Sequence, residues 1–153
     1  MGYCDYLKNT LRPLGLYELD RGLSAAELAC EGAAMDALDS TVTLTAADMF
    51  PLTASDEGIG VWELYMPYTG HFSDRERRRK CVNTFLRLAS YDCSLSGLNA
   101  AIAACGIPAV VAETDTSCLV RVSISGLSGT ELLLAKECIE LILPCHLEIE
   151  YDQ

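Results

Sequence analysis

The sequence predicts an α+β fold, in which an N-terminal helical bundle is followed by a small α/β subdomain with a three-stranded sheet. Apolar residues recur at helical spacing over residues 4–105, and prolines and glycines separate the periodic segments. After residue 108 the spacing changes to alternation in short segments, which is typical of strands. We place the helical region at residues 1–92 and the α/β subdomain at residues 93–153.

The helical region contains four predicted helices, at residues 4–12, 24–50, 56–66 and 74–90. The longest carries Met35, Leu38 and Val42 along one side and is rich in small residues. Its β-branched segment at 41–43 disfavours helix, so the sequence leaves open whether this helix is broken near Thr41. Because part of so long a helix cannot be covered by a chain of this size, we expect it to pack against another subunit.

Three helix starts match the capping-box pattern, in which a Ser binds the N3 amide and a Glu three residues later reaches back. The pairs are Ser24 with Glu27, Ser73 with Glu76, and Ser128 with Glu131.

The α/β subdomain is predicted to begin with a helix at 94–105. Strands follow at 109–113, 118–125 and 146–151, and a helix at 129–143 is ended by Pro144. This order gives a mixed or antiparallel sheet with a helix on one face.

The second half of the helical region holds the only Trp and most of the positive charge. We expect Trp62 to be buried, since it shares a helical stripe with Ile59 and Met66. Arg77 and Arg78 are expected to pair with carboxylates, and Glu63 is the first candidate because it lies on the preceding helix. Arg79 is placed on an outward stripe.

Charge argues against nucleic-acid binding. The chain of 153 residues has a net charge of −11, and six of its eleven basic residues lie between Arg75 and Arg87. A winged-helix DNA-binding regulator remains the alternative, because a basic helix, a second helix and two strands occur in order. The second helix, which would enter the major groove, contains no Lys or Arg.

The residue pattern indicates no catalytic, cofactor-binding or metal-binding site. The eight cysteines include no CxxC pair, and most are expected to be reduced thiols at core positions. The two histidines are His71 and His146. Cys145 precedes His146 directly, and adjacent residues of a strand point to opposite faces, so these two do not form a catalytic pair. No apolar run is long enough to span a membrane, and no secretory signal is recognised.

Four features in order resemble the YmfQ/XkdU-type phage tail proteins of Mu-like prophages and contractile particles. They are Pro51 before a helix, the Trp62–Glu63 pair, the Glu76–Arg78 triplet and the closing Pro144–His146, with Cys145 where the family has Ala. The resemblance covers residues 23–152.

The resemblance implies a structural wedge component of a baseplate with no enzymatic activity and no cofactor. It would join a larger wedge protein through a helical bundle, in a sixfold assembly with other baseplate or hub proteins. It further implies a virion or tail-like particle, assembled in the bacterial cytoplasm. Whether that particle is a phage, a bacteriocin or an injection system is left open, as is the copy number.

Overall fold

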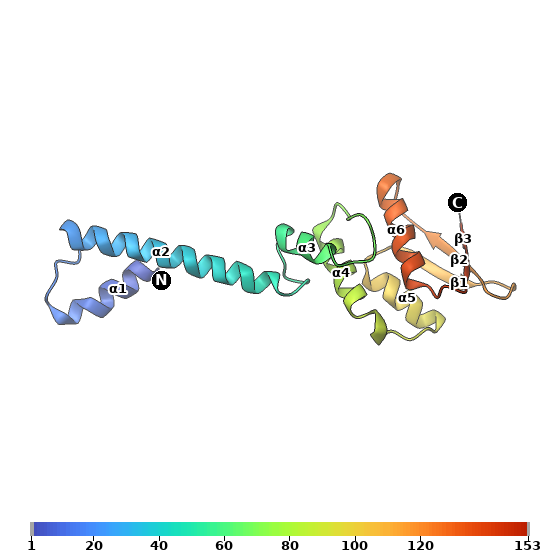
Figure 1. The fold of residues 1–153 in the computed structure, drawn as a ribbon, viewed down its shortest axis with the longest axis horizontal. Helices are drawn as coiled ribbons and strands as arrows, with labels where there is room; N and C mark the ends of the chain where they lie inside the picture. Colours follow the sequence, from blue (N-terminus) through green and yellow to red (C-terminus); the bar gives the residue numbers. More distant parts are fainter. Residues whose placement is uncertain (1, 153) are drawn as a thin grey trace. The chain divides into compact units, whose positions relative to one another are not determined.

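A computed structural model describes residues 2–152, and within them the chain forms six α-helices and a three-stranded sheet (Figure 1). The elements are α1 (Tyr3–Leu11), α2 (Gly22–Asp48), α3 (Asp56–Glu63), α4 (Arg75–Leu86), α5 (Leu95–Ala104), β1 (Ala109–Glu113), β2 (Leu119–Ile124), α6 (Gly129–Ile142) and β3 (Glu148–Tyr151). The predicted α+β class is confirmed.

The chain divides into two compact units, at residues 1–47 and 48–153. This boundary differs from the one expected at residue 92. The reason is that α4 contributes Cys81 to the same core as α5, α6 and the sheet, which gives the C-terminal unit more helices than the sequence pattern suggested.

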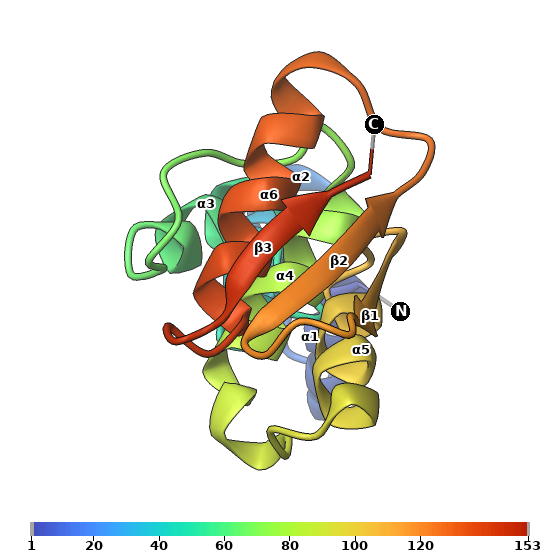
Figure 2. The same ribbon diagram turned by 90° about the vertical axis from the view of Figure 1, so that its right-hand side faces the viewer.

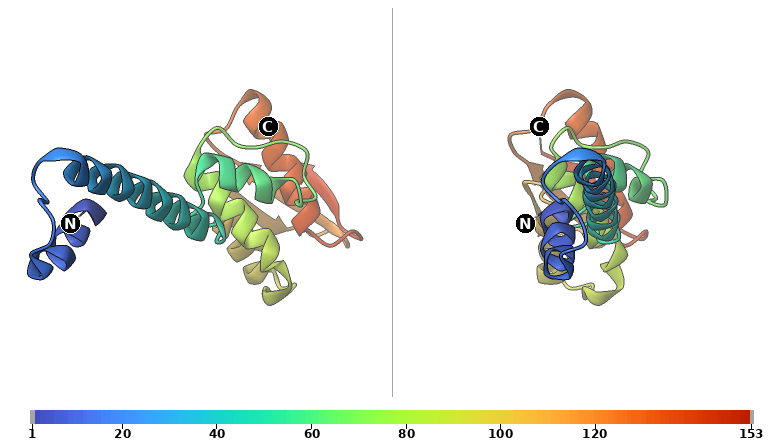
Figure 3. Two further views of the ribbon diagram at one scale, coloured as in Figure 1. Left: turned by 60° about the vertical axis from the view of Figure 1, so that its left-hand side comes forward. Right: turned by 90° about the vertical axis from the view of Figure 1, so that its left-hand side faces the viewer.

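The N-terminal unit is a helical hairpin in which α1 lies beside the first half of α2 (Figure 3). The backbones meet at Gly32, where an added Cβ would lie 2.6 Å from the backbone of Cys4. The start of α1 is held by Asp36, whose Oδ1 accepts from the Tyr3 amide at 3.0 Å. Of the large apolar side chains that the structure describes in this unit, only Leu19 and Leu28 are buried.

The helix α2 continues unbroken through Thr41. Thr41 donates to the Ala37 carbonyl at 2.9 Å, and Thr45 donates to the Thr41 carbonyl at 2.8 Å. These bonds back to the preceding turn allow threonine within a helix. The question left open by the sequence is therefore answered in favour of one continuous helix.

In the C-terminal unit, the strand order is β1-β2-β3. The β1–β2 pair is antiparallel, and β3 runs parallel to β2 after the crossover helix α6. The helices lie behind one face of the sheet (Figure 2). Val111, Val120 and Val122 point into this core, whereas the opposite face carries Arg121 and Glu150 together with the exposed Val110.

The predicted capping boxes are absent at all three serines. Ser24 lies inside α2, Asp74 rather than Ser73 caps α4, and Ser128 makes no capping hydrogen bond. Glu131 is used elsewhere, because it accepts hydrogen bonds from Ser73 across the unit. These bonds lower the pKa of Glu131. Side-chain caps do occur at Ser55, which begins α3, and at Ser94, which begins α5.

One edge of the sheet is closed by a side chain. Asn99 on α5 donates to the Val111 carbonyl at 2.9 Å, and its Oδ1 accepts from the Val111 amide at 2.8 Å. The Asn99 amide therefore takes the place of a neighbouring strand at Val111, the central residue of β1.

We expect Asn99→Ala to lower the free energy of unfolding by about 2 kcal/mol, because it leaves backbone groups of a half-buried strand unpaired. Urea denaturation measures the change. Asn83→Ala is the matched control, since Asn83 is half-buried on α4 and its side chain makes no hydrogen bond within the described residues. Equal losses in the two variants would show that the Asn99 bonds are not stabilising.

Candidate protein interaction site

The basic helix α4 is fixed to α3 by a bidentate ion pair. Arg78 donates to Glu63 through Nε at 3.0 Å and through Nη2 at 2.7 Å. The two side chains are 14% and 10% exposed, so the pair is largely removed from water. The hydrogen bond to Glu63 raises the pKa of Arg78. This is the pair expected from the sequence.

The neighbouring arginines also have partners inside the C-terminal unit. Arg77 pairs with Glu131 at 3.3 Å, and Arg75 pairs with Asp56 at 3.4 Å. A guanidinium beside a carboxylate is partly neutralised already, so Arg75 and Arg77 are less available to a phosphate than free arginines.

The expectation that Arg79 points outward is wrong. Its Nε donates to the Ala54 carbonyl at 2.8 Å, and its side chain is only 16% exposed. The Ala54 carbonyl belongs to the loop before α3. The spacing of side chains along a helix cannot show that a distant backbone carbonyl accepts a hydrogen bond from one of them.

Trp62 is half-buried, not buried as expected. Its ring packs against the small cluster of Ala54, Ile59 and Val82, while its other side is open to solvent. The indole Nε1 donates to the Asp48 carbonyl at 3.0 Å, which fixes the ring to the start of this unit. The ring therefore lies at the edge of a small cluster and not inside the main core.

Trp62→Phe should lower the free energy of unfolding by about 1 kcal/mol, because it keeps most of the apolar contact and removes the bond to Asp48. Thermal unfolding followed by circular dichroism measures the loss. A loss of about 3 kcal/mol or more would indicate a fully packed ring of the kind that the sequence suggested.

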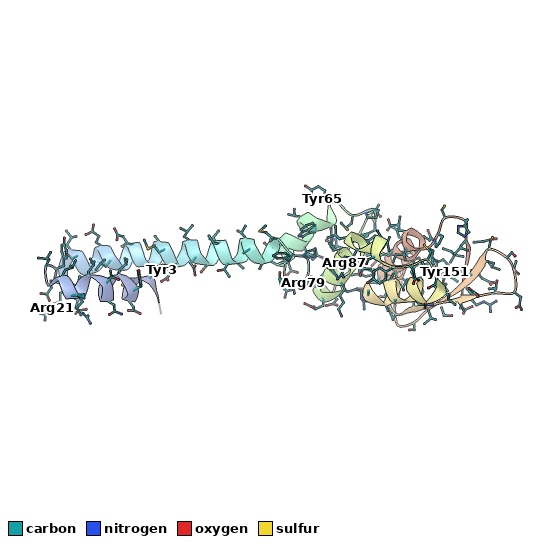
Figure 4. The ribbon with its side chains drawn as sticks, turned by 90° about the horizontal axis from the view of Figure 1, so that it is seen from below. Tyr3, Arg21, Tyr65, Arg79, Arg87 and Tyr151 are labelled. Atoms are coloured by element: carbon teal, nitrogen blue, oxygen red, sulfur yellow. The ribbon has the colours of Figure 1, made fainter. Side chains whose placement is uncertain are left out.

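Several large apolar side chains close to Trp62 in the sequence are exposed. Val61, Leu64 and Tyr65 are exposed on or directly after α3, and Tyr65 projects outward (Figure 4). Three more large side chains on the segment before α3 are exposed, namely Met49, Phe50 and Leu52. We call these six residues and Trp62 the α3 patch. These exposed apolar residues lie within seventeen positions of one another in the sequence, between Met49 and Tyr65.

A second apolar surface lies on the N-terminal unit. Met35, Leu38 and Val42 are 42%, 64% and 58% exposed on α2. They follow one another at intervals of three and four residues, as do the a and d positions of a coiled coil. We call these three residues the α2 seam. The seam begins near Asp36, the α2 residue that binds the first residue of α1, Tyr3.

The cysteines divide between core and surface. Cys81, Cys105 and Cys138 are fully buried, whereas Cys30, Cys93, Cys118 and Cys145 are exposed, so the expectation that most lie in the core is wrong. Hydrogen bonding to Cys81, together with burial, raises the pKa of Cys105. A thiol held protonated in this way is a weak nucleophile.

His146 lines one cavity together with Cys93 and Cys118. No hydrogen bond joins His146 to either thiol among residues 2–152, so a Cys–His pair is not formed there. Within the same residues, no group of three or more His, Cys, Asp or Glu side chains is arranged to hold a metal ion. Nor is any described helix long and apolar enough to cross a membrane.

The sequence-predicted site residues fall into two groups. Met35, Leu38 and Val42 form the α2 seam of the N-terminal unit. In the C-terminal unit, Trp62, Glu63, Arg77 and Arg78 lie at the joint of α3 and α4, and Pro144 follows the end of α6. Sequence reasoning missed the exposed residues before and after α3, although their size and closeness to one another were visible. Neither a known family model nor a curated protein matches the chain.

Proposed function

We propose that this protein is a structural component of a contractile tail baseplate, the smaller wedge subunit that joins a larger wedge protein through a helical bundle. The exposed α2 seam is the observation that carries the proposal. A unit of 47 residues with two buried large side chains cannot stabilise a long helix by itself, since small units need other support. Partner helices packed on the seam would supply that support.

The α3 patch would give the C-terminal unit a contact surface of its own. Its aromatic and aliphatic side chains are of the type that anchors protein interfaces. The Arg78–Glu63 pair would hold α3 and α4 rigid beneath this surface, so that the anchors keep their positions. Such a protein would hold other subunits in fixed positions. It would be part of the sixfold baseplate of a virion or tail-like particle, assembled in the bacterial cytoplasm.

Co-expression with the larger wedge protein of the same gene cluster tests the proposal. Light scattering after sizing should show self-association of the chain alone and a complex of defined mass for the pair. A stable monomer that forms no complex with the larger protein would contradict the proposal.

The same proposal excludes catalysis and DNA binding. The purified protein should turn over no ester or phosphate substrate and contain no stoichiometric zinc. It should also fail to retain duplex DNA at physiological salt. Specific DNA binding that weakens steeply with salt would favour the winged-helix alternative instead.

A further inference from the structure

The two edges of the sheet differ. Asn99 occupies the backbone groups of Val111 on the β1 edge, as described above. Along β3, no side chain or backbone group of residues 2–152 is hydrogen bonded to the backbone amides of Ile149 or Tyr151. A strand edge without such cover is a template for another strand.

The register fixes which groups of β3 face this open edge. The Glu148 amide donates to the Cys118 carbonyl at 2.7 Å, and the Asp152 amide donates to the Val122 carbonyl at 3.0 Å. In a parallel pair, alternate residues of a strand bond to the same neighbour. Ile149 and Tyr151 therefore direct their N–H and C=O groups away from β2, toward the open edge.

The two faces of this edge have different chemistry. Ile149 and Tyr151 are half-buried against the core. On the outer face, Glu150 meets Arg121 of β2 at 3.3 Å, whereas Glu148 has no ion pair among the described residues. A basic side chain on the outer face of an added strand would lie next to Glu148 and Glu150. It would pair with them across the strands, as Arg121 of β2 pairs with Glu150.

A second copy of β3 does not fit this edge. Facing residues of two paired strands must lie on the same face of the sheet. Antiparallel pairing therefore sets Glu148 against Glu150 or Asp152, or Glu150 against itself, and parallel pairing sets like residues together. Every such register brings carboxylates together, which destabilises the pair.

We propose that the open edge of β3 binds an extended segment of a partner protein, in which apolar residues alternate with Lys or Arg. The backbone of Ile149 and Tyr151 would supply the hydrogen bonds, and the acidic outer face would select the basic residues. This inference does not depend on the proposed function, because it rests on the sheet of the C-terminal unit and not on the α2 seam.

The test uses the full chain and an eight-residue peptide of alternating Lys and Val, with the matching Glu–Val peptide as its control. Hydrogen exchange reports protection of the Ile149 and Tyr151 amides, and titration gives the affinity. Glu148→Lys reverses a charge on the open edge. Glu113→Lys makes the same change of net charge on β1, whose edge Asn99 covers. Both positions are exposed, and unfolding curves check that both variants fold.

We expect the Lys–Val peptide to protect the Ile149 and Tyr151 amides and the Glu–Val peptide to leave them unchanged. Glu148→Lys should weaken binding about tenfold, and Glu113→Lys less than about twofold. The proposal is overturned by protection confined to β1, by equal binding of the two peptides, or by equal weakening in the two variants. Absence of binding, or protection of the same amides by self-association without peptide, overturns it as well.

Discussion

Replacing Arg78 by Met is expected to lower the free energy of unfolding by about 3 kcal/mol. The substitution keeps much of the side-chain volume but leaves the Glu63 carboxylate, only 10% exposed, without its partner. An unpaired charge in such a place is costly, because it has lost both water and its counter-ion. Chemical denaturation of the otherwise unchanged chain measures the effect.

Two variants make this result specific. Arg121→Met removes an arginine whose pair with Glu150 is about half exposed, and it should cost less than about 1 kcal/mol. Adding Glu63→Gln to Arg78→Met removes the unpaired carboxylate. The double variant should therefore recover most of the lost free energy of unfolding. Equal losses for Arg78→Met and Arg121→Met would contradict the assignment of a buried joint between α3 and α4.

Replacing Leu38 or Val42 by Asp should strongly weaken the complex with the larger wedge protein while leaving the isolated chain folded. Both side chains are already exposed in the N-terminal unit, so a carboxylate there breaks no internal contact. In a bundle the same carboxylate would be buried against apolar neighbours, which weakens association by roughly tenfold or more. Copurification of the tagged partner with each variant measures the loss.

Ala37→Asp is the matched control for these variants. Ala37 is exposed and lies on the side of α2 away from Met35 and Val42, at a spacing outside the coiled-coil seam. It introduces the same charge into the same helix. If Ala37→Asp reduces copurification as much as Val42→Asp does, the seam is not the contact surface.

The periodic features of the chain were predictable from the sequence. The change from helical spacing to alternation identified β1 and β2 within about a residue, and Pro51 and Pro144 follow α2 and α6 closely. The pairing of Arg78 with Glu63 was predictable too, since two successive short helices bring such side chains together. In each case the signal is local in the sequence.

Features that depend on distant residues were not predictable. The Ser128–Glu131 pattern predicts a capping box, but Glu131 instead accepts hydrogen bonds from Ser73, 58 residues away. Arg79 binds the Ala54 carbonyl, and a backbone acceptor has no sequence signature. Helical spacing alone could not show that the ring of Trp62 lies at the surface.

Amide hydrogen exchange along the second half of α2 tests the central claim most directly. The measurement compares residues 35–46 in the isolated chain with the same residues in the complex with the larger wedge protein. Exchange should be fast in the isolated chain when it is dilute enough to be monomeric, because only the first half of α2 packs against α1. It should be markedly slower in the complex. Equal exchange of this segment in the two samples would contradict a bundle built on α2.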